Sequence, residues 1–311
     1  MAALEFKYLV VITGPTAIGK TSLAIELALK LHTEIISVDS RQFYKELKIG
    51  TASPTPQQLQ LVNHHFVDHL SIEDYYNASM FEVEANKKIV ELFDHHNQVV
   101  ATGGSGLYID ALCYGIDELP TVDPELRKNL LEKYKKEGIA SIRQQLKKLD
   151  PRYYSMVDLK NPNRILKGIE VSIMTGKPYS SLLTREKQSR GYNVIKIALT
   201  MNREDLYARI NDRVDKMIEW GLVEEARSLF PVKHLNALNT VGYKELFAHF
   251  EGAISLDKAI ELIKRNTRHY AKRQISWFKR DPSIKWFDIK RKDEIMTYIL
   301  ERVEHAKSTR K

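Results

Sequence analysis

The chain has 311 residues and a hydrophobic content of 43%, enough for a buried core, and it is long for one compact domain, so we expect a main domain with a smaller domain or an insertion. Its one cysteine, Cys113, excludes an intramolecular disulfide and a zinc site built from cysteines. No segment approaches the roughly 20 apolar residues that span a membrane, and this favours a cytoplasmic location. The net charge of +8 is consistent both with binding to a polyanion such as nucleic acid and with a generally basic surface.

Strands and helices alternate along the first part of the chain. Apolar, β-branched runs at residues 8–12, 34–38 and 98–102 predict buried parallel strands. Apolar residues recur at helical spacing after the first of these runs, and further helices are predicted over residues 78–93 and from Leu107 onward. This alternation predicts an α/β fold with a parallel sheet flanked by helices.

The character of the sequence changes between residues 121 and 191. Strand-like runs disappear there, and Lys and Arg become dense. A helix that starts at Asn163 should stop near Gly176, because Pro178 follows that glycine. We therefore predict an all-helical insertion over residues 121–193.

The α/β pattern resumes after the insertion. A strand is predicted over residues 194–199, and from Asn202 onward only helices are expected, the last long one over residues 256–278. The core should thus combine residues 1–120 with residues 194–311, the latter forming a helical C-terminal region.

A loop of the pattern GxxxxGK[ST] lies between the first strand and the first helix. Its residues are Gly14, Pro15, Thr16, Ala17, Ile18, Gly19, Lys20 and Thr21. The backbone N–H groups of such a loop point inward at a helix N-terminus, where the helix dipole favours anions. Lys20 should reach the outer phosphate oxygens, and the Thr21 hydroxyl should bind Mg²⁺. The sequence therefore predicts a site for a phosphate-bearing ligand, of which ATP is the usual example.

Two features count against an ATP-driven motor or kinase. The strand at residues 98–102 ends in Thr102-Gly103-Gly104, where a Walker B acid would be expected. This second glycine turn opens another helix, so two helix N-termini should meet at one edge of the sheet. The acid that does end a strand is Asp39, which suits either a metal ligand or a general base.

Several longer motifs accompany this loop, and they occur in one order along the chain. They are GPTAIGKT from Gly14, VDSRQFYKELKIGTASP from Val38, ATGGSGLY from Ala101, NPNRILKGIEV from Asn161, RINDRVDKM from Arg209, NTVGYKE from Asn239 and TRHYAKRQISWFKRD from Thr267. With these motifs the chain resembles the tRNA dimethylallyltransferase family, also called tRNA isopentenyltransferases, from Tyr8 to about Asp288. We expect a bacterial-type member without the C-terminal zinc module that eukaryotic members often carry.

The resemblance implies transfer of a dimethylallyl group from dimethylallyl diphosphate to N6 of the adenosine next to the anticodon, position 37 of tRNA. Pyrophosphate leaves, so residues 14–21, with Mg²⁺ on Thr21, should stabilise the charge that develops on it. Asp39 is the expected base for the N6 proton. Arg213 should contact pyrophosphate and is expected to be catalytic, with Arg209 one turn away as a further diphosphate ligand. Ser105 replaces the threonine of the family motif but keeps the hydroxyl, so we expect it to act in catalysis and in tRNA binding.

The family's contacts to tRNA map onto four parts of the sequence. The expected tRNA-binding residues are Asp39, Ser40, Arg41, Gln42, Arg127, Asn163, Arg164, Ile165, Leu166, Lys167, Asn239, Thr240, Val241, Gly242, Tyr243 and Lys244. Asn163 and Lys167 stand where many members have Gln and Arg, so their hydrogen bonds should differ in detail. The basic and aromatic residues of the helix at 256–278 suit contacts to an RNA backbone. We expect the protein to act as a monomer, with the anticodon stem-loop of tRNA as its partner.

Three alternatives remain. A related enzyme could prenylate free adenine nucleotides (AMP, ADP or ATP), although a mononucleotide needs no long insertion or basic helix. A small-molecule kinase would use ATP at the same loop. A non-catalytic RNA-binding protein could keep the loop as a nucleotide sensor, but Asp39 and Arg213 argue against it.

Overall fold

The computed structural model describes residues 6–117, 119–120, 123–184 and 188–308. The chain divides into two compact units, the larger made of Met1–Tyr114 with Ser189–Lys311 and the smaller of Gly115–Gln188. Thr121, where the insertion was expected to begin, lies outside the described residues. Across the part of the chain that is described, no helix has both the length and the apolar character needed to cross a bilayer.

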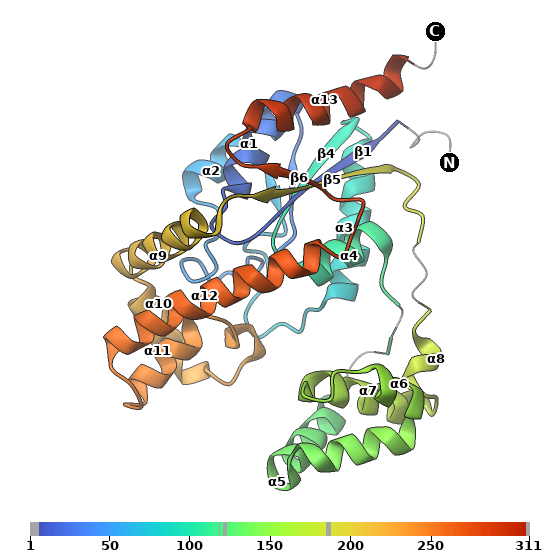
Figure 1. The fold of residues 1–311 in the computed structure, drawn as a ribbon, viewed down its shortest axis with the longest axis vertical. Coiled ribbons are helices and arrows are strands. Elements are labelled where there is room, and N and C mark those ends of the chain that lie inside the picture. Colours follow the sequence, from blue (N-terminus) through green and yellow to red (C-terminus); the bar gives the residue numbers. More distant parts are fainter. Residues whose placement is uncertain (1–5, 118, 121–122, 185–187, 309–311) are drawn as a thin grey trace. The chain divides into compact units, whose positions relative to one another are not determined.

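The larger unit is an α/β fold, as the sequence predicts (Figure 1). Its strands are β1 (Tyr8–Thr13), β2 (Ile35–Ser37), β3 (His64–His65), β4 (Gln98–Thr102), β5 (Asn193–Thr200) and β6 (Lys285–Asp288). Its α-helices are α1 (Lys20–Leu31), α2 (Pro56–Leu61), α3 (Ala78–Phe93), α4 (Gly106–Tyr114), α9 (Arg203–Glu219), α10 (Leu222–Leu229), α11 (Tyr243–Phe250), α12 (Leu256–Phe278) and α13 (Lys292–Ser308).

The six strands form one sheet in the order β3-β2-β4-β1-β5-β6, and every pair in it is parallel. Ile12 of β1 is in register with Thr102 of β4 and Ile197 of β5. The central strands therefore end at the same level, and the loops that follow them meet at one edge of the sheet. That edge is where open α/β folds bind ligands.

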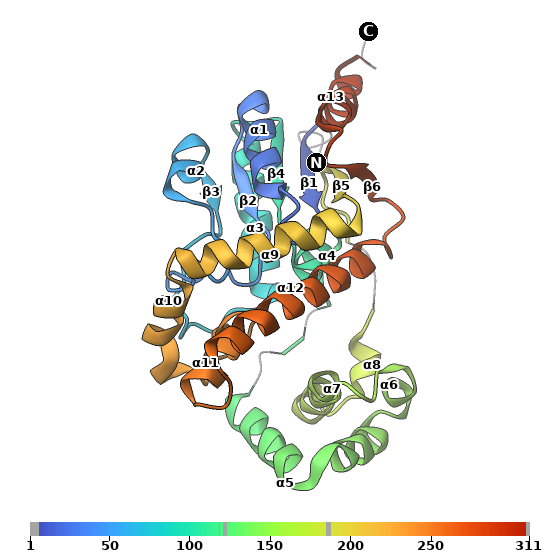
Figure 2. The same ribbon diagram turned by 60° about the vertical axis from the view of Figure 1, so that its left-hand side comes forward.

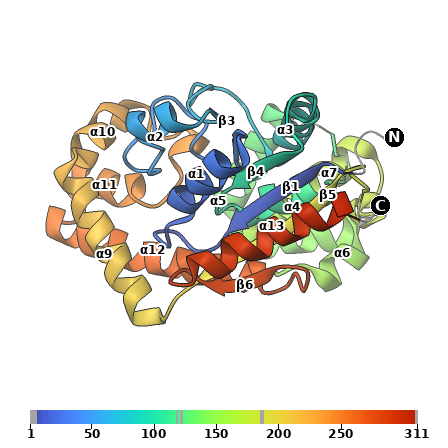
Figure 3. The same ribbon diagram turned by 90° about the horizontal axis from the view of Figure 1, so that it is seen from above.

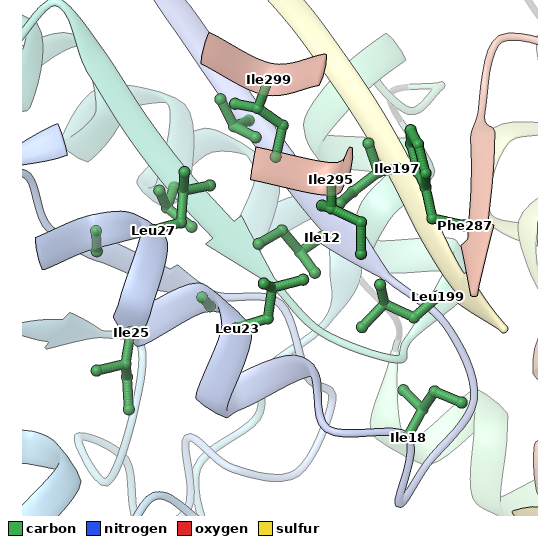
Figure 4. Packing of buried hydrophobic residues seen from close by; sticks show 14 of the residues in the cluster. Ile12, Ile18, Leu23, Ile25, Leu27, Ile197, Leu199, Phe287, Ile295 and Ile299 are labelled. Atoms are coloured by element: carbon green, nitrogen blue, oxygen red, sulfur yellow. The ribbon is translucent and has the colours of Figure 1, made fainter. Parts of the chain in front are cut away.

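The core of the larger unit fills one face of this sheet (Figure 4). Ile12 and Ile197 point from the strands toward Leu23 and Leu27 of α1 and toward Ile299 of α13. Alternation along β1 sends Leu9 and Val11 to the other face, and both are fully buried. Figure 3 shows α3 on the side of the sheet away from α13. With helices on both faces, the strands read as continuous apolar runs.

One expectation from the sequence is wrong: the chain beyond Asn202 is not only helical. Lys285–Asp288 forms β6, which pairs with β5 at the edge of the sheet. This strand has four residues, and only Trp286 and Phe287 are apolar, so its sequence carries no clear strand pattern. The two-residue strand β3 at the opposite edge, which was not foreseen, is equally short.

The smaller unit is all helical, with α5 (Pro124–Leu149), α6 (Pro151–Met156), α7 (Pro162–Thr175) and α8 (Tyr179–Leu182). Its core consists of Leu130, Ile142, Leu146, Ile165, Leu166 and Ile169. Asp150 joins three of its helices: its carboxylate accepts the Tyr153 N–H at 2.8 Å, and the N–H and hydroxyl of Ser180 at 2.6 and 2.8 Å. The unit therefore has its own hydrophobic core and a buried carboxylate that connects its helices by hydrogen bonds.

Ile12→Ala is predicted to lower the free energy of unfolding by about 2–5 kcal/mol, because it leaves a cavity between the sheet and α1. The control Val83→Ala, on the exposed side of α3, should change it by less than about 0.5 kcal/mol. All three tryptophans lie in the larger unit, so urea unfolding followed by tryptophan fluorescence reports on it. Equal unfolding midpoints for the two variants would contradict this assignment of the core.

Candidate active site

A cavity of about 410 Å³ lies in the larger unit at the carboxyl ends of the strands. Thr102 and Gly103 at the end of β4 and Asp39 just after β2 line it together with the phosphate loop. Of the residues expected from the sequence to form the site, it is lined by Thr16, Lys20, Thr21, Asp39, Ser40, Arg41, Gln42, Arg213, Asn239, Thr240, Val241, Gly242 and Lys244. Segments far apart in the chain are thus brought to one concave surface.

The phosphate loop connects β1 to α1 through a backbone that glycine suits. Gly14 and Gly19 have φ values of 139° and 105°, where other residues are strained. Among the described residues, none caps the N-terminus of α1 with its side chain, in contrast to α3, α9 and α12. The amide N–H groups of the first turn of α1 remain available for an anion.

Of the cations that line the cavity, Lys20 and Arg213 lie beside the phosphate loop and come from different elements. The Lys20 ammonium donates to the Pro15 carbonyl at 2.8 Å, and the Arg213 guanidinium on α9 donates to the Thr16 hydroxyl at 3.3 Å. Burial, helped by the neighbouring Arg213 charge, lowers the pKa of Lys20 to about 7, and the Asp39 carboxylate opposes this shift. Burial also lowers the pKa of Arg213. Two like charges held together in a poorly solvated place favour the binding of an anion.

Asp39 faces the same cavity from the end of β2. Its Oδ1 accepts the Arg41 N–H at 2.9 Å, which orients the carboxylate. Burial raises the pKa of Asp39, while backbone hydrogen bonds from Arg41 and Gln42 and the charge of Lys20 act in the opposite direction. A carboxylate with a raised pKa is a stronger base than an exposed one.

Ser105 lies directly behind this surface, not on it. Its buried hydroxyl accepts the Ser40 N–H at 2.9 Å and is hydrogen-bonded to the phenol of Tyr270, which lines the cavity. The second glycine turn is therefore tied to the segment that carries Asp39. This geometry supports an indirect effect of Ser105 on the site through Ser40 and Tyr270.

The sequence reasoning missed Gln274, whose side chain joins α12 to both glycine turns. Its Oε1 accepts the Thr16 N–H at 2.8 Å, and its Nε2 donates to the Gly104 carbonyl at 2.9 Å. A signal was present, because Gln274 is a polar residue on the buried stripe of α12, between Ala271 and Phe278. Buried amides in such a position need hydrogen-bond partners, here the two loops of the site.

An apolar wall of the cavity was also missed. It consists of Ile210, Val214 and Met217 of α9, Leu222 of α10 and Ile263 of α12. Helices α9 and α12 lie side by side (Figures 1 and 2), and the Arg268 guanidinium joins them by donating to the Asn211 side chain at 2.6 Å. The cavity therefore pairs a cationic end with an apolar surface.

Several expected tRNA-binding residues have side chains that the protein itself uses. The Gln42 amide accepts from the Ser37 hydroxyl and donates to the Thr51 and Ala52 carbonyls. Tyr243 is fully buried, so a contact to RNA at this position would come from its backbone.

Other expected residues lie outside the cavity lining. Arg209 is exposed, and its guanidinium is 3.7 Å from the point that a Cβ on Gly19 would occupy. Gly14, Pro15, Ala17, Ile18 and Gly19 shape the loop without lining the cavity. Ile18 packs into the core, so only its backbone is available to a ligand.

The remaining expected residues belong to the smaller unit. Asn163 and Arg164 are exposed at the start of α7, where Asn161 caps the helix by accepting the Arg164 N–H. Ile165 and Leu166 are fully buried in the core of this unit. The Arg127 guanidinium lies 3.4 Å from the buried Glu170 carboxylate, and burial lowers the pKa of the neighbouring Lys167.

The chain is similar in sequence to a family of known proteins. The model of the IPP transferase family matches residues 42–281. The chain is 55% identical to tRNA dimethylallyltransferase 2 of Azobacteroides pseudotrichonymphae genomovar. CFP2, over 96% of this chain and 97% of that protein.

The fold is also similar to those of solved transferase structures. The full-length tRNA isopentenylpyrophosphate transferase from Bacillus halodurans matches with a TM-score of 0.71 and 33% identity, covering 96% of this chain and 97% of that one. A eukaryotic dimethylallyltransferase acting on tRNA matches with a TM-score of 0.72 and 25% identity, over 91% of this chain and 74% of that one. The chain therefore belongs to the tRNA dimethylallyltransferase (IPP transferase) family.

Proposed function

We propose that this chain transfers a dimethylallyl group from dimethylallyl diphosphate to N6 of the adenosine at position 37 of tRNA, releasing pyrophosphate. The observation that carries this proposal is the composition of the cavity. Lys20, Arg213 and the phosphate loop suit a diphosphate, the apolar wall suits a branched five-carbon group, and Asp39 is a base beside them. A kinase needs no apolar wall next to its phosphate loop.

The diphosphate is the leaving group. As the bond between C1 of the dimethylallyl group and the diphosphate oxygen breaks, negative charge builds up on that oxygen. Lys20, Arg213 and the amides at the start of α1 are already oriented to receive it, so little reorganisation is needed. Arg209 beside Gly19 is a further cation for the outer phosphate.

The donor set also fits Mg²⁺, which prefers oxygen ligands. The Thr21 hydroxyl and the Asp39 carboxylate both face the cavity. Thr21 would hold the ion together with phosphate oxygens, as in other loops of this pattern. When bound, Mg²⁺ would neutralise charge on the diphosphate.

Asp39 acts on the acceptor. The lone pair of adenine N6 is delocalised into the ring, so N6 is a poor nucleophile until its proton is removed. In the proposed step N6 forms the bond to C1, the C1–O bond breaks toward pyrophosphate, and the N6 proton passes to the Asp39 carboxylate. The raised pKa of Asp39 suits this proton transfer.

The exposed side of α12 offers a surface for RNA. Arg265, Lys272 and Arg273 are exposed there, and just beyond the end of the helix the Arg280 guanidinium stacks over the Trp277 ring, 3.9 Å from its centroid. In the smaller unit the exposed Arg164 is the strongest candidate, and residues 121–193 are proposed to serve tRNA binding. A monomer working on cytoplasmic tRNA is the simplest arrangement, since one chain supplies every group named here.

The test is a parallel incubation of the protein with radiolabelled dimethylallyl diphosphate and Mg²⁺, with unmodified tRNA in one tube and AMP in the other. Label that enters only the tRNA supports the proposal, and digestion to nucleosides then locates it on N6 of one adenosine. Label in AMP would assign the chain to nucleotide prenylation. Label in neither, from folded protein, would contradict prenyl transfer.

The pH dependence of kcat/KM for dimethylallyl diphosphate is predicted to be bell-shaped. Lys20 must be charged to bind the diphosphate, and its pKa of about 7 lies below the usual value, so its charge is lost as the pH rises above that value. Asp39 must be ionised, so activity also falls as the pH drops through its raised pKa. Above pH 7, kcat/KM should fall about tenfold per pH unit, while kcat falls later because bound diphosphate restores the Lys20 charge.

Lys20→Arg is the matched control, because a guanidinium keeps its charge across this range. The falling limb should disappear in this variant even if its overall rate is lower. A falling limb that persists unchanged would assign the limb to another group.

A further inference from the structure

Two segments outside the phosphate loop line the cavity, and one of them belongs to the residues expected from the family resemblance to contact tRNA. Residues 50–52 lie in the connection between β2 and α2, and residues 239–242 lead into α11. They come from distant parts of the chain and contain no regular strand or α-helix. Contacts from other residues are therefore needed to keep these two segments at a fixed spacing in the cavity wall.

Glu225 on α10 contacts residues 48–50 at the start of the first segment and Tyr243, which directly follows the second. Its Oε2 accepts the N–H groups of Lys48 and Ile49 at 3.0 and 2.8 Å. Its Oε1 accepts the Gly50 N–H at 2.9 Å and the Tyr243 hydroxyl at 2.7 Å. One carboxylate thus accepts four hydrogen bonds, and both of its oxygens are used. Because the acceptor is charged, each bond is stronger than its neutral equivalent.

The two segments also fit each other closely. A Cβ on Gly50 would lie 2.6 Å from the Tyr243 ring, so no larger residue fits there without movement. Burial and the Glu225 carboxylate raise the pKa of the Tyr243 phenol, which therefore stays protonated and donates at neutral pH. Glu225, Tyr243 and residues 48–50 behave as one packed unit.

Direct hydrogen bonds connect this unit to the segment that carries Asp39. The Gln42 amide donates to the Thr51 and Ala52 carbonyls, so the segment at 50–52 is tied to the one that carries Asp39. The hydrogen bonds of Glu225 given above all go to residues 48–50 and 243, and none goes to residues 14–21. Movement of this wall should disturb the acceptor side of the site first.

We propose that Glu225 is a positioning residue for the acceptor adenine: it holds the segments at 48–52 and 239–244 at the spacing that admits the base beside Asp39. It does not line the cavity, so it acts through these segments. The inference rests on the function proposed above. Glutamine has the same shape, but in either orientation its NH₂ group would face at least one N–H group of residues 48–50, which cannot accept a hydrogen bond, and would repel that segment.

The test compares Glu225→Gln with Glu224→Gln, the exposed neighbour on the same helix, and with Tyr243→Phe. For each variant, kcat and KM are measured for tRNA and for dimethylallyl diphosphate, and binding of radiolabelled dimethylallyl diphosphate is measured directly. Glu225→Gln should lower kcat/KM for tRNA by about 10- to 100-fold, because small misplacements of a reacting group have effects of this size. Tyr243→Phe should lower it by about threefold, as expected for one hydrogen bond. Glu224→Gln should match the wild type.

The affinity for dimethylallyl diphosphate decides between positioning and general support of the fold. It should stay within about twofold of the wild type in Glu225→Gln, since none of the Glu225 bonds given above reaches the phosphate loop. Wild-type turnover in Glu225→Gln would overturn the inference, and so would an equal loss of diphosphate affinity. A wild-type chain that prenylates AMP and not tRNA contradicts the proposed acceptor alone, and the same variants then report on KM for AMP. A wild-type chain that is inactive on both overturns the function and the inference together.

Discussion

Asp39→Asn is expected to lower kcat for dimethylallyl transfer by about 100- to 10,000-fold, the usual contribution of a general base. The amide has the shape of the carboxylate, and its oxygen can still accept the Arg41 N–H that orients residue 39. Loss of activity would therefore report the loss of the base and not a rearranged loop. The measurement is single-turnover transfer of label to tRNA at saturating substrates.

Asp94→Asn, on the exposed end of α3, is the control for the substitution and should behave like the wild type. Asp39→Asn should also lose the acidic limb of the pH profile. Turnover within about threefold of the wild type would remove Asp39 from the chemical step, because a base contributes far more than that.

Lys20→Met is expected to lower kcat/KM for dimethylallyl diphosphate by about 100- to 1,000-fold, the range found when one preorganised donor to a developing anion is removed. Methionine keeps most of the length of the side chain and removes the charge. Since burial lowers the pKa of Lys20, its charged form is disfavoured in the folded protein. Burying the charged ammonium therefore lowers the free energy of unfolding of the wild type. This loss is fully present below pH 7 and shrinks as the pH rises toward the ordinary pKa of lysine. Methionine carries no charge and avoids the loss, so the Tm of Lys20→Met at pH 6 should not be lower than that of the wild type.

Lys216→Met provides the comparison on the surface. Lys216 is exposed and forms an i,i+4 ion pair with Asp212 on α9, so its loss should change neither kcat/KM nor Tm appreciably. A Lys20→Met variant that binds and turns over dimethylallyl diphosphate normally would show that the phosphate loop serves another ligand.

The sequence predicts long elements and misses short ones. Strand β4 and helices α3 and α12 have the predicted bounds, because each has a clear apolar period and a marked end. Strands β3 and β6 were missed because two and four residues are too few to show a period. Both exist through pairing with β2 and β5, which is a tertiary effect that local pattern does not contain.

Some residues of the site could likewise be predicted from the sequence, and others could not. The phosphate loop and Asp39 could be placed at one edge of the sheet, since both follow parallel strands. Arg213 came from the family resemblance, and the structure brings it to within 3.3 Å of the Thr16 hydroxyl. Gln274 and Glu225 could not be assigned, because what they do depends on backbone groups more than a hundred residues away.

The side-chain amide of Gln274 can form both of its hydrogen bonds in only one orientation. Its oxygen must face the Thr16 N–H and its nitrogen must face the Gly104 carbonyl, so the side chain cannot be reversed, and glutamate would turn one of its two bonds into a repulsion. The same helix presents its basic side outward and the amide inward. Through this side chain α12 is joined directly to the Thr16 N–H of the phosphate loop and to the Gly104 carbonyl, so a movement of the helix would alter one or both of these hydrogen bonds. Any coupling through these bonds would be reciprocal: a ligand of the phosphate loop that moved α12 would change the affinity of α12 for its own ligand by the same factor as the reverse.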